Sequence, residues 1–284
     1  MKHLSKRSLA VLLALCLLFL PACRPFVVVS TPEEGILYIT FLDVGQGDAI
    51  LLQTDEGAIL VDAGTEKSEE ALIMELKTLG VVSLMLFVMT HPDADHIGGA
   101  DGIINAFPIE EVWISGAPSE SAANRRMGEA LDHAGIEAKA VTKDTTYALG
   151  SLQLLVLSPI EPTSDTNASS VVILASYGET DLLLMGDADK KVEKRIIGDY
   201  PAWKLDCEIL KAGHHGSKTA SSAAFLEVAL PEYTIISCGA GNSYGHPHGE
   251  VLDRLSDVGS EVLRTDLLGS ISFHTDGREL AVGR

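Results

Sequence analysis

The sequence predicts an α/β protein in which two β-sheets pack face to face between layers of helices. Strand-like and helix-like segments alternate along almost the whole chain, and long apolar strands occur in both halves. Helical segments lie between the strands and can cover the outer faces of the sheets. The chain has 284 residues, of which 46% are hydrophobic and 21% charged, so it is long enough for one large domain with a sizeable core.

The first half of the chain opens with three apolar runs separated by Gly- and Asp-rich turns, a pattern typical of a β-meander. A later continuous apolar run indicates a strand that is buried on both faces. The strands expected in this half are 36–42, 48–54, 57–63, 83–90, 111–115, 137–142 and 151–158, and the expected helices are 67–79, 96–107 and 119–134.

The second half repeats this alternation of strands and helices. Its expected strands are 170–177, 181–187, 207–212 and 233–238, followed by closing strands toward residue 282, and its expected helices are 219–229 and 248–258. Two cysteines, Cys207 and Cys238, lie in or beside apolar strands. Two cysteines are too few for a disulfide framework, and both lack the closely spaced partner of a cysteine-based zinc site. From the sequence they either pair with each other or are buried free thiols.

Residues 1–22 have the pattern of a secretory signal, in which three basic residues precede an apolar run at 9–20. This run is too short for a membrane span, which needs roughly 20 apolar residues. The sequence LPAC, which ends at Cys23, resembles a bacterial lipobox, so Cys23 is the expected lipidation site. Pro21 is unusual in this pattern and leaves an uncleaved anchor, or cleavage without lipidation, open. In each case the folded part is expected outside the cytoplasm, lipid-anchored to the cell membrane or secreted.

Residues 23–34 have the mixed composition of a short tether, which leaves 35–284 as a single domain. The 21 Lys and Arg residues against 40 Asp and Glu residues give a formal charge of −19, and loss of the signal with its three basic residues would make it −22. Such a charge argues against sequence-specific DNA binding or DNA packaging through a broad basic surface. Only local groups such as Lys211, Lys218 and the arginines at 125–126 are available to contact phosphates.

Potential metal ligands are concentrated directly after the predicted strand 83–90. The sequence THPDADHIGG holds four of them within six residues, namely His91, Asp93, Asp95 and His96. A loop that turns into a helix can bring all four toward one point, and imidazole with carboxylate suits zinc, manganese or iron. The alternative is a polar loop with Asp95 as helix N-cap, but a cap needs one such residue and this loop has four.

The same chemistry recurs after three other predicted strands. Asp187 stands at the end of one of them, where a carboxylate can bridge two ions. Two histidine clusters follow the others: His214 with His215, and His246 with His248. Six of the nine histidines lie in these clusters and in the THPDADHIGG segment, a distribution that scattered core histidines would not show.

These motifs resemble those of the metallo-β-lactamase-fold hydrolases, and within them the soluble domain of the ComEC-like competence proteins and their stand-alone relatives. The resemblance extends over residues 36 to about 282 and rests on six motifs in order: FLDVGQGDAILL, LVDAG, THPDADHIGG, LLLMGD, LKAGHHGS and SYGHPHGEVL. It implies an αββα sandwich of two mixed sheets flanked by helices, with metals at the sheet edges.

The resemblance also implies two divalent metal ions. It makes His91 and Asp93 ligands of one ion, Asp95 and His96 ligands of the other, and Asp187 the bridging carboxylate. Either His214 or His215 would complete the second site. The family's third histidine of the first site has no counterpart between His133 and Asp187, where Asn167 is the nearest residue in chain order. The first site is therefore expected to be oxygen-rich, which shifts the expected metal from zinc toward manganese.

Two ions about 3.5–4 Å apart would activate a bridging water and hold the attacking and leaving oxygens of a substrate. A phosphodiester suits such a site, with Asp95 serving both metal binding and catalysis. A histidine from His215, His246 or His248 would protonate the leaving group. The expected substrates are short nucleic acids, nucleotides or phosphodiesters of cell-envelope polymers, by analogy with the nuclease role proposed for the ComEC domain.

Two alternatives to a phosphodiesterase stay open from the sequence. The same fold supports hydrolysis of an amide, a lactone or a thioester. A different class is a non-catalytic lipid-anchored binding or accessory protein, because fold does not fix function.

Overall fold

The computed structural model describes residues 32–283. In the first half of the chain the elements are β1 (Leu37–Phe41), β2 (Ile50–Thr54), β3 (Gly57–Val61), the short 3₁₀ turn η2 (Glu66–Ser68), α2 (Glu69–Thr78), β4 (Leu84–Met89), α3 (Ala94–Ile97), α4 (Ala100–Ala106), β5 (Ile109–Ile114), α5 (Ala122–Ala134), β6 (Ala138–Ala140), β7 (Thr146–Leu149) and β8 (Leu152–Ser158). All the strands and helices predicted for this half are present, and β7 is additional.

In the second half the elements are η3 (Asn167–Ser169), β9 (Val172–Tyr177), β10 (Thr180–Leu184), α6 (Lys190–Asp199), α7 (Ala202–Leu205), β11 (Ile209–Lys211), η4 (Gly213–Gly216), α8 (Ala223–Ala229), β12 (Tyr233–Ile236), α9 (Gly249–Asp257), β13 (Glu261–Arg264), α10 (Thr265–Leu268), β14 (Ile271–Thr275) and β15 (Leu280–Val282). The sequence analysis missed α6. Two signals for it were present in the sequence. One is the N-cap residue Asp189, whose side chain accepts hydrogen bonds from the backbone of Lys191 and Val192. The other is the helical spacing of Val192 and Ile196.

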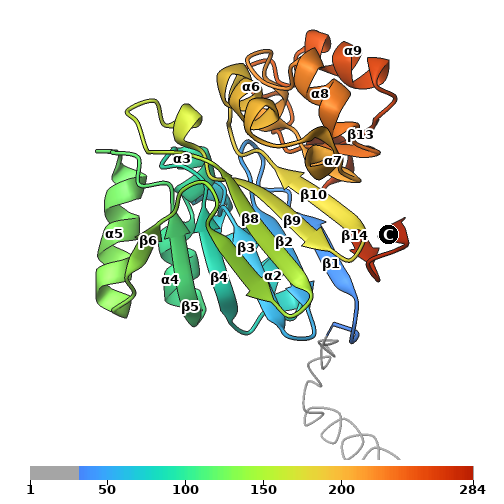
Figure 1. Cartoon of the computed structure of the whole chain (residues 1–284). Helices are drawn as coiled ribbons and strands as arrows, with labels where there is room; N and C mark the ends of the chain where they lie inside the picture. Colours follow the sequence, from blue (N-terminus) through green and yellow to red (C-terminus); the bar gives the residue numbers. More distant parts are fainter. Residues whose placement is uncertain (1–31, 284) are drawn as a thin grey trace, which may run out of the picture. The chain divides into compact units, whose positions relative to one another are not determined.

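The strands form two mixed sheets that lie face to face, with helices on the outer faces (Figure 1). The first sheet has the order β15-β14-β1-β2-β3-β4-β5-β6, and the second has the order β13-β12-β11-β10-β9-β8-β7. The pairs β3–β4, β4–β5 and β5–β6 of the first sheet and β10–β11, β11–β12 and β12–β13 of the second are parallel. The other neighbouring strands are antiparallel. The predicted αββα sandwich is therefore confirmed.

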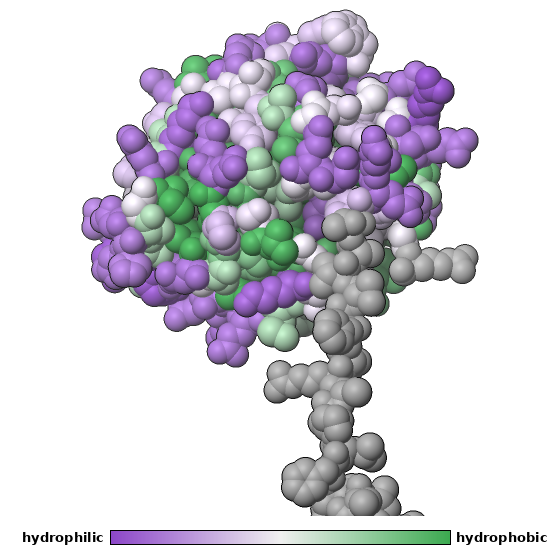
Figure 2. All heavy atoms as spheres, turned by 90° about the horizontal axis from the view of Figure 1, so that it is seen from below, coloured by the Kyte–Doolittle hydropathy of each residue, from purple (hydrophilic) through white to green (hydrophobic). Residues whose placement is uncertain are grey.

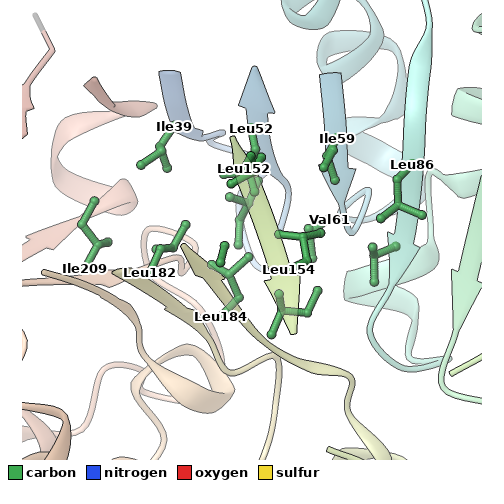
Figure 3. Packing of buried hydrophobic residues seen from close by; sticks show 14 of the residues in the cluster. Ile39, Leu52, Ile59, Val61, Leu86, Leu152, Leu154, Leu182, Leu184 and Ile209 are labelled. Atoms are coloured by element: carbon green, nitrogen blue, oxygen red, sulfur yellow. The ribbon is translucent and has the colours of Figure 1, made fainter. Parts of the chain in front are cut away.

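The main hydrophobic core fills the space between the two sheets. Figure 3 shows aliphatic side chains of β1–β4, such as Leu52 and Val61, directed toward those of β8, β10 and β11, such as Leu154 and Leu184. The alternation of side chains along a strand sends the intervening residues to the other face of each sheet. Leu51 of β2, for example, packs in a second core beneath α2, α4 and α5, and a third core lies beneath α6, α8 and α9.

One of the helices predicted in the first half is split. The sequence analysis expected a continuous helix over 96–107, whereas α3 ends at Ile97 and α4 begins at Ala100. At Gly98 a Cβ atom would lie 2.5 Å from the backbone nitrogen of Glu66, so the close approach of the preceding η2 turn requires glycine here. Because of this break, α3 is a separate short helix beside the ends of β3 and β4.

Parallel strands direct their carboxyl ends to the same edge of a sheet, and loops at that edge commonly carry function. Here the chain after β3 and β4 and the chain after β10, β11 and β12 meet at such edges. The opposite end, where β4 begins, is viewed in Figure 2, in which apolar side chains gather over part of the face and hydrophilic ones surround them. Within residues 32–283, no helix combines the length and the apolar character needed to span a membrane.

Candidate metal centre

The loop after β4 is fixed by a carboxylate from the loop after β3. Asp62 accepts hydrogen bonds from the backbone nitrogen of Thr90 at 2.8 Å and from the Thr90 hydroxyl at 2.7 Å. Its Oδ2 also accepts from His96 Nδ1 at 2.7 Å. This bond fixes the tautomer of the His96 ring and turns its Nε2 toward the second sheet, which is how carboxylates commonly orient metal-ligating histidines.

Asp187, which follows β10, lies between two groups of histidines. Its Oδ1 is 3.2 Å from His96 Nε2 and 3.5 Å from His215 Nε2. Its Oδ2 is 3.8 Å from His91 Nε2 and 3.6 Å from His214 Nε2. Each oxygen of this buried carboxylate therefore has its own pair of imidazole nitrogens.

The two aspartates of the THPDADHIGG segment divide in the same way. Asp93 Oδ2 lies 3.7 Å from His91 Nε2, and Asp95 Oδ2 lies 3.3 Å from His215 Nε2. The structure thus brings together all seven residues that the sequence analysis named as metal ligands. They form one set of His91, Asp93 and His214 and another of Asp95, His96 and His215, with Asp187 between the sets.

The donor atoms of this cluster fit divalent metal ions. Within residues 32–283, His91 Nε2 and Asp187 Oδ1 are buried and have no hydrogen-bond partner, a costly arrangement for polar atoms unless a further group binds there. The cluster borders a cavity of about 140 Å³, which Gln46, Tyr244 and His246 also line. Imidazole nitrogens with carboxylate oxygens are ligands for zinc and manganese. The buried Asp and His residues are therefore consistent with metal binding.

The backbone at His214 and His215 is held in an unfavourable conformation to direct both rings inward. Their φ angles are 50° and 53°, in the left-handed region that costs roughly 1–3 kcal/mol for such residues. The backbone nitrogen of His214 donates to the Gly186 carbonyl at 3.0 Å, and His215 Nδ1 donates to the Ser237 carbonyl at 2.9 Å. These contacts from neighbouring strands oppose the strain and aim each Nε2 at Asp187.

Mutual electrostatics change the pKa values across the cluster. Burial alone would raise the pKa of Asp187, but the charges of His215 and His96 hold it well below the usual value. Burial opposes charge on His96 and His215 as well, yet the nearby carboxylates raise the pKa of both rings. Burial and the His96 charge lower the pKa of His91 to about 4. A metal ion that binds here would have to displace the protons of His96 and His215, so its affinity would fall at acidic pH.

Residues 42–240 match the sequence profile of the Metallo-beta-lactamase superfamily. The chain belongs to this superfamily. ComE operon protein 3 of Bacillus subtilis is 30% identical over 259 residues, which are 84% of this chain and 33% of that protein. Competence protein ComA of Neisseria gonorrhoeae is 32% identical over 246 residues, or 86% of this chain and 33% of that protein. The chain thus spans about a third of the length of these relatives, and the predicted likeness to competence proteins is confirmed.

The superfamily fold is also evident in a solved structure. The metallo-beta-lactamase fold protein YhfI from Bacillus subtilis superposes with a TM-score of 0.56 at 13% identity, over 86% of this chain and 100% of that one. At this identity the likeness concerns the fold alone.

His246 and His248 take different places in this superfamily member. His246 lines the cavity beside the cluster, whereas His248 is not among the described residues that line it. The ring centroids are 5.0 Å apart, and His248 Nδ1 accepts from the backbone nitrogen of Lys218 at 3.2 Å. Burial, followed by the charges of His215, His214 and His248, lowers the pKa of His246 to about 4. Asn167, the nearest residue to the missing histidine in chain order, does not line the cavity either.

A buried ion pair beneath the cluster escaped the sequence analysis. Lys211 and Asp48 are both almost fully buried, and Lys211 Nζ is 2.7 Å from Asp48 Oδ2. Asp48 also belongs to a group with His96, Asp187 and His215 whose ligand atoms lie within 4.8 Å of one another. Gly47 lets the loop after β1 pack against the backbone of Asp95, because a Cβ at Gly47 would lie 2.2 Å from the Asp95 carbonyl oxygen.

This burial corrects the expectation that Lys211 is available to contact phosphates. With no exposed surface, the ammonium group cannot reach a substrate, and it also donates to the Ala212 carbonyl at 2.8 Å. The sequence signal for a buried, paired lysine was the position of Lys211 inside the apolar strand EILKA. A lysine is almost never fully buried unless it is paired, so a partner carboxylate was to be expected.

We predict that Lys211→Met lowers the free energy of unfolding by about 3–5 kcal/mol, because it leaves the Asp48 carboxylate buried without its counter-charge. Urea unfolding in the presence of a chelator measures this loss. The double variant Lys211→Met/Asp48→Asn removes both charges and should recover much of it. The exposed Lys218→Met is the control and should change stability by less than about 0.5 kcal/mol. Equal losses in the single and double variants would show that the ion pair is not the cause.

Proposed function

We propose that the protein is a metal-dependent phosphodiesterase that cleaves short nucleic acids. The observation that carries this proposal is the placement of Asp187, each of whose oxygens faces its own set of histidine and aspartate donors. Such a pair of sets around a shared carboxylate suits two ions, and paired ions suit phosphodiester hydrolysis.

In this proposal His91, Asp93 and His214 hold one ion, and Asp95, His96 and His215 hold the other, with Asp187 shared. His214 takes the place of the third histidine that the first site otherwise lacks, so neither site depends on Asn167. The ions when bound supply a Lewis acid that activates water and neutralises the charge on the phosphate oxygens. Each set contains a carboxylate of its own, Asp93 in one and Asp95 in the other, and carboxylate oxygen is compatible with manganese as well as zinc.

The chain's own residues would bind the substrate and handle its proton. His246 lines the cavity but belongs to neither set, so it is the best-placed ring to transfer a proton to the leaving oxygen. Its lowered pKa keeps it neutral at pH 7 in the free protein. A bound phosphodiester anion beside the ring would favour its protonated form. His248, which lies against His246, would then influence the protonation of His246 and would not contact the substrate.

Two observations support a short nucleic acid as the substrate. The relative from Neisseria gonorrhoeae is named for competence. The formal charge of −19 disfavours long DNA, whose capture relies on many Lys and Arg contacts to phosphates. A short strand needs only the local contacts that the cavity and its metals can provide.

We predict that the purified protein binds about two manganese or zinc ions per chain and hydrolyses bis(p-nitrophenyl) phosphate. Asp187→Ala should reduce both metal content and hydrolysis to background, because each set loses the Asp187 oxygen that faces it. Mass spectrometry of metals and p-nitrophenol release measure the two effects. Asp257→Ala, an exposed aspartate of α9, is the matched control. Hydrolysis without bound metal, or metal binding without hydrolysis in any ion, would contradict the proposal and favour the amide-hydrolase or binding-protein alternatives.

The two neighbouring histidines should have separable effects on metal content. Removal of His214 is expected to empty the set that contains His91, and removal of His215 the set that contains His96. We therefore predict about one ion per chain for each alanine variant, with different residual affinities in isothermal titration. If His214→Ala keeps both ions at wild-type affinity, then His214 is not a ligand and the first site is held by His91, Asp93 and Asp187 alone.

We further propose, from the sequence of residues 1–23 alone, that the protein is exported and anchored to the membrane by a lipid on Cys23. These residues lie outside those that the structure describes. We predict that the mature protein starts at Cys23 with a mass increase from acyl chains, and that Cys23→Ser releases it from the membrane fraction. Intact-mass measurement and fractionation test this. An unmodified mature terminus, or an uncleaved chain, would instead support secretion or a simple anchor.

A further inference from the structure

A second cavity adjoins the one over the metal centre. It has a volume of about 480 Å³, within the range of about 300–1,000 Å³ for ligand pockets. Gln46, Asp95 and Tyr244 line both cavities, so the two lie side by side. The second cavity runs along the η2 turn and the start of α5, away from the histidines. A ligand with one end at the metal centre can therefore extend into it.

Tyr244 offers an aromatic surface at the junction of the two cavities. Its side chain is 63% exposed, which is unusual for a large ring beside a buried site. The ring stacks on His246, with centroids 5.5 Å apart and an interplanar angle of 21°. A ring that is supported on one side and exposed elsewhere is a suitable platform for a nucleobase, because every base has a π-face.

Hydrogen-bond donors lie around the rest of this second cavity. Gln46 Oε1 accepts from the backbone nitrogen of Gly239 at 3.2 Å, which fixes the amide, while Gln46 Nε2 is buried and has no partner among residues 32–283. Lys67 is exposed at the rim and forms no ion pair with another described residue. The first turn of α5, a helix of 13 residues, carries no acidic side chain, so its dipole favours an anion.

The charged side chains that line this cavity are two acidic and two basic ones, Glu66, Asp95, Lys67 and Arg126. Glu66 is paired with Arg126 at 3.3 Å, and Arg126 is in turn 3.3 Å from Asp101. Asp95 faces the metal centre through its contact with His215. Among the described residues that line this cavity, Lys67 is therefore the cation without an ion-pair partner.

We propose that this second cavity binds the nucleoside next to the scissile phosphodiester, with its base stacked on Tyr244 and the following phosphate beside Lys67 and the start of α5. This inference rests on the proposed phosphodiesterase function and specifies its substrate as single-stranded oligonucleotide. A base can reach Tyr244 only when it is unstacked from its neighbours, which excludes an intact duplex. A polyol phosphate of the cell envelope has no flat ring for this platform.

The test compares a short single-stranded DNA with the same strand that lacks one base beside the cleaved bond. We predict that Tyr244→Ala lowers kcat/KM on the intact strand by roughly 5- to 100-fold, whereas Tyr244→Phe retains it. On the strand without that base, the alanine variant should lose much less. Trp203→Ala, which removes another exposed aromatic ring far along the chain on α7, is the control and should leave both rates unchanged.

Binding gives a second readout that does not depend on turnover. With a labelled phosphorothioate oligonucleotide, which resists hydrolysis, fluorescence anisotropy of the metal-loaded protein should show weaker binding for Tyr244→Ala than for the wild type. Lys67→Gln should reduce the slope of log affinity against log salt by about 0.7, the value for one phosphate contact on a single strand.

The outcomes separate this inference from the function on which it rests. If the wild type fails to hydrolyse bis(p-nitrophenyl) phosphate, the phosphodiesterase proposal fails and this inference falls with it. If that substrate is cleaved but Tyr244→Ala affects the intact and base-free strands equally, only the nucleoside site is overturned. Faster cleavage of a polyol phosphate than of oligonucleotide, without an effect of Tyr244→Ala, would also overturn it and assign the site to an envelope polymer.

Discussion

The rest of the site depends on the contacts of the Asp187 carboxylate. It comes from the second sheet, yet its two oxygens face histidines from both sheets, His91 and His96 on one side of the sandwich and His214 and His215 on the other. A buried carboxylate with such a low pKa needs compensating positive charge. The imidazoles provide it in the free protein, and divalent ions are suited to provide it when bound. The packing of the two sheets therefore controls the geometry of the cluster.

The sequence predicted much of this arrangement because the residues of the cluster and its support follow apolar strands. Asp62, His91, Asp187 and His214 each come within a few residues of a strand's carboxyl end, and parallel strands bring such ends together. The resemblance implied two sets but assigned His214 or His215 to the set of His96, and neither it nor the patterning predicted that His214 faces the same Asp187 oxygen as His91. His214 and His215 are adjacent, and on a regular strand or helix they would diverge. Their left-handed backbone, stabilised by Gly186 and Ser237, makes both converge on Asp187.

Other features were missed because they depend on contacts between segments far apart in the chain. The Lys211–Asp48 pair joins the loop after β1 to the end of β11, and nothing local to either residue identifies the other. The helix α6 was missed for a different reason. Its N-cap, Asp189, can be recognised in the sequence, but few residues of the helix are apolar. Long-range pairing of buried charge is a property of the folded chain, whereas a cap is readable from the sequence.

The acidic charge of the whole molecule and the proposed nucleic-acid substrate can be reconciled by the scale on which each acts. A charge of −19 repels a long polyanion over many phosphates, and screening limits that repulsion to about 8 Å at physiological salt. Within the two adjoining cavities, the proposed metal ions would offset the carboxylates of the cluster, and Lys67 and the start of α5 would add positive charge. A short strand meets these local groups and few of the surface carboxylates. The same imbalance that argues against long DNA is therefore compatible with the small phosphodiesters of the proposed function, for which the exposed ring of Tyr244 would supply attraction that is independent of charge.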